Sequence, residues 1–276
     1  MNSPVPEAFA RDCAELRSGP VVHALPVVAS ANLVANALLA VGASPVMSQL
    51  AGEIASIHRR CAAVVLTLGT PDAGRFELLR AVHSSATDRG LPAVLDPVAV
   101  GASPLRLGLA LELLAGPALV VRGNRGELLA LAGGAGASSP DDRRQDPAPL
   151  WELGRPALTD LARRHVLLAT GALDSLWTQE RRHRGTRGHV LQSRVTGMGC
   201  ALSALVAAFR AVNADAFEAA LHALWLANAA AELAGGRAGG PGTFVPLWLD
   251  ALAFLTLNPE AASTPPLPQE GGPYGH

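Results

Sequence analysis

Five short, almost wholly apolar runs alternate with longer stretches along the first 170 residues. The runs are Pro20–Leu25, Ala62–Leu68, Pro92–Leu95, Ala118–Arg122 and His165–Thr170. Strands that are buried on both faces of a sheet have such nearly continuous apolar sequences. Strands that alternate with helices along a chain form a parallel sheet covered by helices. The pattern therefore predicts an α/β protein with three α/β/α layers, in which helices flank a mostly parallel central sheet.

The stretches between these runs, and three more after them, have the residue spacing of helices. The expected helices are Ala31–Val41, Val46–Arg59, Gly74–Arg89, Ser103–Leu114, Arg125–Ala132, Cys200–Val212, Ala214–Ala234 and Phe244–Leu257. We find no internal repeat and no domain boundary, so residues 1–258 are expected to form a single domain. The composition of Gly133–Pro149 predicts an exposed loop, and that of Pro259–His276 predicts a disordered tail.

One strongly basic run, Glu180–His189, admits two interpretations. It could be a nucleic-acid patch, or the solvated tip of a hairpin between Ser175–Thr178 and Val190–Arg194. Proteins that bind unpaired nucleic-acid bases stack aromatic side chains on them, and none interleaves with the arginines here. We therefore favour the hairpin and expect no nucleic-acid partner.

Composition and charge argue against several classes of protein. The net charge is −1, so no overall field attracts nucleic acid or anionic lipid. All 22 basic residues are arginine, which excludes a P-loop lysine and a lysine Schiff base with pyridoxal phosphate. The three cysteines are widely spaced, unlike those of a zinc site or a disulfide framework. No signal-peptide core and no apolar run of about 18 residues is found, so we expect a cytoplasmic protein without a membrane partner.

The segment Val195–Cys200 places two glycines and a cysteine at the start of an apolar helix that continues through Phe209. Backbone N–H groups at such a turn, together with the positive end of the helix dipole, favour a bound anion. The same surroundings lower the pKa of a thiol, so Cys200 is a candidate base or nucleophile. The structural alternative is a tight turn followed by a small buried cysteine.

Polar residues follow the expected strands at the ends where ligands bind in open α/β sheets. Asp96 follows the third strand, Arg122 ends the fourth, and Thr170 ends the fifth. Asn124 and Glu127 begin the helix after the fourth strand, where they could simply form a capping box. Likewise, Asp96 could cap a turn and Thr170 could begin an ordinary loop. Taken together, these groups favour a site for Mg²⁺-assisted phosphoryl transfer from a nucleotide without a P-loop.

Over most of Val21–Leu252, the chain resembles the hydroxyethylthiazole kinase family of the ribokinase-like superfamily. The segments that carry the resemblance are Val22-His23, Asn36–Met47, Leu68–Thr70, Val94–Val98, Arg122–Asn124 with Glu127, Thr170-Gly171, Val195–Cys200, and Gly240–Phe244 with Leu249–Leu252. The resemblance implies a ribokinase-like fold. It also implies transfer of the γ-phosphate of ATP to the primary alcohol of 4-methyl-5-(2-hydroxyethyl)thiazole, a reaction of thiamin salvage.

The resemblance further implies roles for individual residues. Cys200 is expected to be the catalytic base, and Met47 and Gly197 are expected to line the thiazole pocket. The residues expected to contact ATP and its phosphates are Arg122, Asn124, Thr170 and Gly199, and those expected in the Mg²⁺ network are Asp96 and Glu127. The cofactor would be Mg²⁺, the co-substrate ATP, and the assembly a homotrimer.

The chain departs from the family pattern at several positions. Ala24–Val27 replaces a polar stretch near the expected acceptor pocket, which removes hydrogen-bonding groups that could recognise a substrate. Near the phosphates, the replacements are Ala99 and Val100 in one loop, Ala172 in a second and Met198 in a third. Two alternatives therefore stay open: a kinase of another small heteroaromatic alcohol, and a non-catalytic member that binds thiazole or nucleotide.

Overall fold

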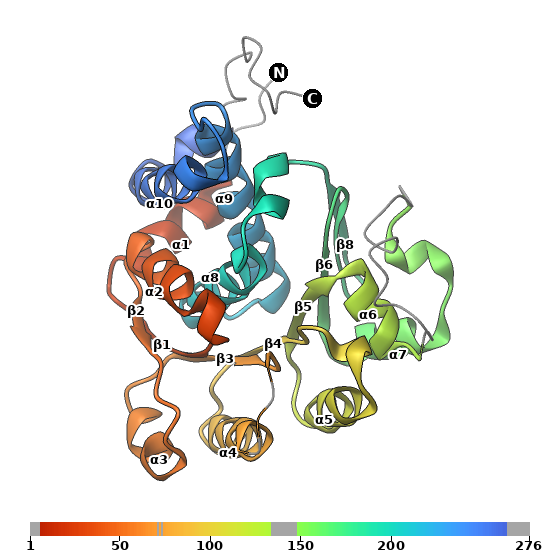
Figure 1. Ribbon diagram of the computed structural model, residues 1–276. Helices are drawn as coiled ribbons and strands as arrows, with labels where there is room; N and C mark the ends of the chain where they lie inside the picture. The colour runs from red at the N-terminus through yellow and green to blue at the C-terminus, as the bar shows by residue number, and fades with distance from the viewer. Residues whose placement is uncertain (1–5, 71, 73, 134–147, 264–276) are drawn as a thin grey trace.

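The computed structural model describes residues 6–70, 72, 74–133 and 148–263. In these ranges eight strands form one sheet in the order β2-β1-β3-β4-β5-β6-β7-β8 (Figure 1). The strands are β1 (Val21–Leu25), β2 (Ser44–Val46), β3 (Ala63–Thr67), β4 (Ala93–Asp96), β5 (Val120–Asn124), β6 (Val166–Thr170), β7 (Asp174–Trp177) and β8 (Arg182–Gly185). β1 to β6 pair in parallel, whereas β7 and β8 continue the sheet in antiparallel pairing. The predicted mostly parallel sheet is confirmed.

Helices cover both faces of this sheet. One layer consists of α3 (Ile54–Ile57), α4 (Arg75–Asp88), α5 (Pro104–Leu114), α6 (Arg125–Leu131) and α7 (Pro156–Arg164). The other consists of α1 (Glu7–Leu16), α2 (Ala31–Ala40), α8 (Met198–Val212), α9 (Ala216–Gly235) and α10 (Pro241–Leu257). Figure 1 shows α3, α4 and α5 below the sheet and α1, α2, α8, α9 and α10 above it. The predicted three-layer arrangement is therefore confirmed.

Each face of the sheet has its own apolar core. Val65 and Val94 point to the core that contains α8, whereas Leu66 and Leu95 point to the core that contains α4 and α5. This alternation follows from the two-residue period of a strand. α8 packs on β1, β3 and β4 and is buried along nearly its whole length, as its apolar sequence predicts. Its N-terminus is thereby fixed at the ends of these strands.

The predicted helix Val46–Arg59 is wrong. Ser44–Val46 forms the edge strand β2, which pairs in parallel with β1. A 3-10 turn over Ala51–Glu53 (η2) then leads into the single helical turn α3. Pairing with the buried strand β1 outweighs the helical spacing of apolar residues in so short a segment.

The predicted hairpin exists, but its second strand was misassigned. β7 pairs with β8, and Val190–Arg194 is instead a 3-10 helix, η6. Arginines of the basic run have acidic partners: Arg181 lies 2.6 Å from Asp215, and Arg187 lies 2.6 Å from Glu232. These ion pairs fit a surface hairpin that packs on α9.

Two further differences concern the ends of the described chain. α1 was not predicted, and it docks through Phe9, whose ring stacks on Phe209 of α8. Pro259–Ser263, where a disordered tail was expected to begin, forms the 3-10 helix η7 and buries Ala262. The rest of that expected tail, and residues 134–147 of the expected loop Gly133–Pro149, lie outside the described residues.

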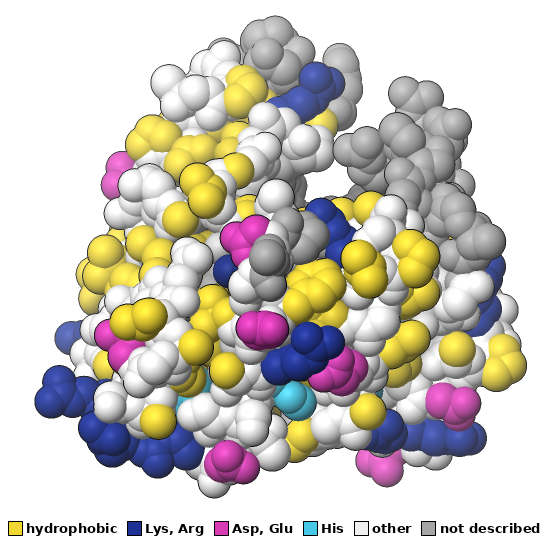
Figure 2. Space-filling model, turned by 60° about the horizontal axis from the view of Figure 1, so that its bottom comes forward, with side chains coloured by type: hydrophobic (Ala, Val, Ile, Leu, Met, Phe, Trp, Pro, Cys, Tyr) yellow, Lys and Arg dark blue, Asp and Glu magenta, His cyan; other side chains and the backbone are white. Residues whose placement is uncertain are grey.

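No helix in the described ranges is long and apolar enough to span a membrane. The surface around α3, α4 and α5 mixes acidic, basic and apolar side chains, as the lower half of Figure 2 shows. This layer is the one opposite α8.

Candidate active site

The polar residues predicted at strand ends meet at one edge of the sheet. β3 and β4 pair Thr67 with Asp96, and β5 and β6 pair Asn124 with Thr170. Because these strands are parallel, their carboxyl ends share one edge. α8 begins at Met198 on the face of the sheet beside β3 and β4. The structure thus brings the strand-end polar groups and the glycine-led helix start together.

Asp96 is the most deeply buried charged group of this cluster. Its side chain is fully buried, and neither carboxylate oxygen has a donor within hydrogen-bond distance among the described residues, although the Cys200 thiol and the Ser203 hydroxyl lie close enough to lower its pKa. Arg122 Nη1 lies 4.0 Å from Asp96 Oδ1. Burial raises the pKa of Asp96 to about 6, although the Arg122 charge opposes the shift. An ionised carboxylate with so few partners favours a cation or a proton as its complement.

Arg122 links Asp96 to the expected phosphate loops. Its Nη2 donates a hydrogen bond to Thr170 Oγ1, while its buried Nε has no acceptor in the described part of the chain. The guanidinium lies directly on Gly199 in the first turn of α8, where a side chain at that position would overlap it. Gly199 therefore makes room for Arg122, and the arginine itself supplies the positive surface at this helix start.

Asn124 and Glu127 form a capping box, the structural alternative that the sequence predicts for them. Asn124 Oδ1 accepts the Glu127 N–H at 2.9 Å, and Glu127 Oε2 accepts the Asn124 N–H at 2.8 Å. Glu127 Oε1 also accepts the Ala99 N–H at 2.9 Å. Ala99 has φ +53°, a left-handed conformation that favours glycine. Glu127 thus holds the strained turn that follows Asp96.

Cys200 occupies the first turn of α8, as predicted, but its predicted electrostatics are wrong. The thiol is buried beside Asp96, and burial together with that carboxylate raises its pKa above the ordinary value. Ser30 and Arg122 oppose this shift without reversing it. The dipole of α8 would lower the pKa, and desolvation outweighs it here. The thiol is therefore protonated at neutral pH.

Gly197 and Met47 lie on the side of the site nearer to β1. Gly197 has φ +91°, and a Cβ there would lie 2.9 Å from Ser30 Cβ, so a glycine is required. Met47 follows β2 and packs against the same apolar cluster that contains Met198 and Cys200. The structure therefore gives both residues an apolar environment.

The residues that depart from the family pattern differ in burial. Met198 and Val100 are buried, so both contribute to the cores, whereas Ala172 is exposed. In the segment Ala24–Val27, the first three residues are buried and Val27 is partly buried. The polar groups lost there are replaced by core packing.

Sequence reasoning missed two buried charged residues at this edge. Arg75, at the start of α4, donates from Nη2 to the Leu25 and Thr67 carbonyls, which end β1 and β3. Asp174 in β7 accepts the Gly171 N–H at 3.0 Å, which fixes the turn after Thr170, and burial raises its pKa to about 6. The signal for Asp174 is a carboxylate at the start of a short buried strand, where an ionised group is costly.

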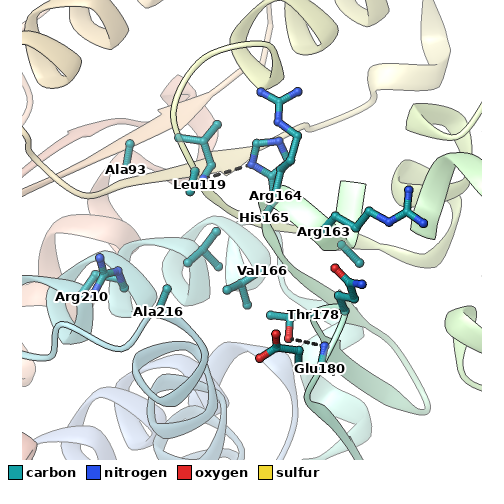
Figure 3. Close-up of a pocket in the computed structure, with 14 residues that line it drawn as sticks. Ala93, Leu119, Arg163, Arg164, His165, Val166, Thr178, Glu180, Arg210 and Ala216 are labelled. Atoms are coloured by element: carbon teal, nitrogen blue, oxygen red, sulfur yellow. Dashed lines mark hydrogen bonds between the residues drawn. The ribbon is translucent and has the colours of Figure 1, made fainter. Parts of the chain in front are cut away.

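A cavity of about 350 Å³ lies at the opposite edge of the sheet (Figure 3). It is lined by the residues that begin β4, β5 and β6 and by the side chains around Thr178. Its arginines already have partners. Arg163 pairs with Asp160 at 2.8 Å, Arg164 donates to two backbone carbonyls, and Arg210 donates to the Asn213 carbonyl. This cavity is separate from the cluster around Asp96.

The three-layer fold is shared with solved structures of other proteins. A solved structure of a ribokinase-like superfamily protein from Enterococcus faecalis has this fold, with a TM-score of 0.58 and 11% sequence identity over 94% of this chain and 92% of that one. A family model described as "Hydroxyethylthiazole kinase family" matches residues 14–258. The chain belongs to the hydroxyethylthiazole kinase family and is an enzyme, a kinase.

Individual relatives agree with this assignment. A hydroxyethylthiazole kinase of Nitratidesulfovibrio vulgaris is 39% identical over 244 residues, which cover 87% of this chain and 90% of the relative. The solved structure of a hydroxyethylthiazole kinase protein from Pyrococcus horikoshii has a TM-score of 0.78 and 33% identity, and covers 90% of this chain and 94% of that one. The resemblance stated from the sequence is confirmed, and ATP is the co-substrate that a kinase of this family implies.

Proposed function

We propose that the chain transfers the γ-phosphate of ATP to the primary alcohol of 4-methyl-5-(2-hydroxyethyl)thiazole, as a step of thiamin salvage. The observation that carries the proposal is the charge pair of Asp96 and Arg122 at the start of α8. The Asp96 oxygens and the Arg122 Nε are buried without hydrogen-bond partners in the described ranges. Buried polar groups are normally paired, so this edge fits a bound cation and phosphates that would complete it.

The phosphates would lie against Arg122, Thr170 and the first turn of α8. Arg122 and Thr170 are already joined by a hydrogen bond, so both would face the same anion. Gly199 would contribute by letting the guanidinium approach the helix start. Asn124 would hold the beginning of α6 in place beside Arg122. Donors that are fixed before the substrate binds are the basis of electrostatic catalysis.

Mg²⁺ is the proposed cofactor. No group of three or more His, Cys, Asp or Glu side chains in the described ranges could hold a metal by itself. Asp96 fits as a ligand because its buried oxygens have no donor within hydrogen-bond distance in the described ranges. Glu127 fits a supporting position because both of its oxygens accept backbone N–H groups. When bound, Mg²⁺ would neutralise charge on the transferred phosphate.

Cys200 is the proposed base. The Cys200 thiol would first lose its proton to solvent. The alcohol oxygen would then form a bond to the γ-phosphorus while the bond to the bridging oxygen of ADP breaks, and the Cys200 thiolate would take the alcohol proton. The thiol pKa is raised by burial and by the Asp96 charge. A bound cation would neutralise the Asp96 charge and so remove its effect on the thiol pKa. We therefore expect Cys200 to deprotonate more readily in the complex than in the free enzyme.

The acceptor would lie between Met47 and Gly197. An apolar lining suits a thiazole ring, whose hydroxyethyl arm would reach toward Cys200. A homotrimer is the proposed assembly, because the resemblance to the family implies it. The expected compartment is the cytoplasm.

The test is ADP release by the purified protein with Mg·ATP and the thiazole alcohol, against a blank without acceptor. We expect Cys200→Ala to lower kcat by at least about a hundredfold while ATP still binds, because general bases contribute on this order. Cys61→Ala is the matched control, because both thiols are 8% exposed and Cys61 lies after α3, outside the site. Equal turnover by the two variants would refute the base assignment.

The same assay separates the two alternatives. A kinase of another heteroaromatic alcohol is favoured by the buried apolar segment that starts at Ala24, and it would release ADP faster with a different acceptor from a panel. A non-catalytic binder would be stabilised against heat by ligand without any ADP above the blank.

A further inference from the structure

Two buried histidines form a hydrogen-bonded chain that runs from the lower helix layer to the segment holding Met47. His23 lies in β1 and is fully buried, and His58 follows α3 and is 2% exposed. His23 Nδ1 lies 3.0 Å from His58 Nε2, and His58 Nδ1 lies 3.0 Å from Ser85 Oγ in α4. At the other end, His23 Nε2 lies 2.9 Å from the Ser48 carbonyl oxygen.

When both imidazoles are neutral, the chemistry of these atoms fixes the direction of every hydrogen bond. The Ser48 carbonyl can only accept, so His23 Nε2 carries a proton. A neutral His23 then has a bare Nδ1, which must accept from His58 Nε2–H. His58 Nδ1 is bare in turn and accepts from the Ser85 hydroxyl. The donation therefore runs one way, from Ser85 through both imidazoles to the backbone of Ser48.

The one-way direction of donation requires both histidines to be neutral. Burial lowers the pKa of His23, although the Ser48 carbonyl and Glu53 raise it. Burial also lowers the pKa of His58 to about 4, with His23 and Arg89 acting in the same direction and Ser85 opposing them. The neutral forms are therefore the stable ones at neutral pH.

The chain ends beside the acceptor side of the site. β2 ends at Val46, which pairs with His23, and the two following residues, Met47 and Ser48, are only partly buried. The Ser48 hydroxyl is held separately by Glu53. The carbonyl of Ser48 is thus tied to the core through His23 at the point where the chain leaves the edge strand.

We propose that His23 and His58 are positioning residues that hold the Met47–Ser48 segment in place for the acceptor alcohol. This role rests on the proposed function, in which Met47 lines the acceptor pocket. His58 acts through His23: by donating to Nδ1, it keeps the proton of His23 on Nε2, where the Ser48 carbonyl needs it. In the proposed function the phosphates of ATP bind at Arg122 and Thr170, on β5 and β6, so we expect the effect on the acceptor alone.

The kinetic test compares two replacements of His58 in the full chain. His58→Gln keeps an N–H donor for His23, whereas His58→Leu keeps an apolar volume and removes the donor. We expect His58→Leu to raise the KM for the thiazole alcohol about tenfold with the KM for ATP unchanged, because a shifted binding group weakens positioning. His58→Gln should restore a KM close to that of the wild type. His83→Leu is the control, since His83 in α4 faces Gly116, away from this chain.

A second measurement reads the chain without turnover. Nitrogen-15 NMR of the imidazoles should find His23 and His58 neutral, with the proton on Nε2 in each, and Ser85→Ala should perturb His58 first. A proton on His23 Nδ1, or an equal rise of both KM values in His58→Leu, would overturn the proposal. If the wild-type enzyme phosphorylates no thiazole alcohol, the proposed function and the acceptor role fail together, while NMR still decides the direction of the hydrogen bonds.

Discussion

Replacing Asp96 by asparagine should make the stability of the enzyme respond differently to pH. Asp96 has an ordinary pKa of 3.8, and burial raises it to about 6 in the folded protein. A pKa raised on folding means that the folded state holds the proton more tightly than the unfolded state does. The contribution of Asp96 to stability therefore falls as the pH rises from about 4 to about 6, and the full penalty persists above that range.

The size of the effect follows from the shift. About two pKa units correspond to about 3 kcal/mol, and about half of this, roughly 1 to 2 kcal/mol, should develop between about pH 5 and about pH 7.5. Asparagine does not titrate, so the difference in unfolding free energy, Asp96→Asn minus wild type, should rise by that amount over this interval. Other groups, such as Asp174, titrate in both proteins and largely cancel.

Urea unfolding of both proteins at the two pH values measures this slope. The offset between the proteins is not predicted, because the new amide costs about 1–3 kcal/mol if it stays unpaired. The variant should also lose nearly all kinase activity. A difference that is constant with pH, or that falls as the pH rises, would refute the reasoning. It would mean that Arg122, 4.0 Å away, stabilises the carboxylate enough to cancel its burial.

Two further substitutions test the contacts around the phosphate side. Gly199→Ala should displace the Arg122 guanidinium and raise the KM for ATP about tenfold. Gly242→Ala in α10 is the control, because a Cβ there meets nothing within 4 Å, and it should leave the KM for ATP unchanged. Equal KM values for the two variants would contradict the role given to Gly199. In the wild type, Asn228 Nδ2 donates to Asp174 Oδ2 at 2.8 Å. Asp174→Asn would place a second N–H donor against this amide, and should destabilise the fold by about 1–3 kcal/mol in urea unfolding. Adding Asn228→Asp should restore most of that loss, and a double variant no more stable than the single one would count against the pairing.

The sheet could be predicted from the sequence because each of its buried strands carries its own signal. The apolar runs that end at Leu25, Leu68, Leu95, Arg122 and Thr170 all became parallel strands within a few residues of their expected bounds. Strand β2 could not be predicted in this way. It is short, lies at the edge and gains its stability from pairing with β1, which local sequence does not reveal.

The composition of the site was predictable, but its electrostatics were not. Strand ends and a glycine-led helix start identify Asp96, Arg122 and Cys200 without a structure. The pKa of Cys200 depends instead on how deeply the thiol is buried and on which carboxylate lies beside it. The histidine chain is hidden for a similar reason, since its four members come from segments that only folding brings together.

The most direct test of the central proposal is phosphorus-31 NMR of the wild-type enzyme with Mg·ATP and 4-methyl-5-(2-hydroxyethyl)thiazole. We predict loss of the γ-phosphate signal in step with the appearance of a phosphate monoester and ADP, and no change when the acceptor is left out. ATP that stays intact in the presence of the thiazole alcohol, or that yields only inorganic phosphate, would contradict the proposal.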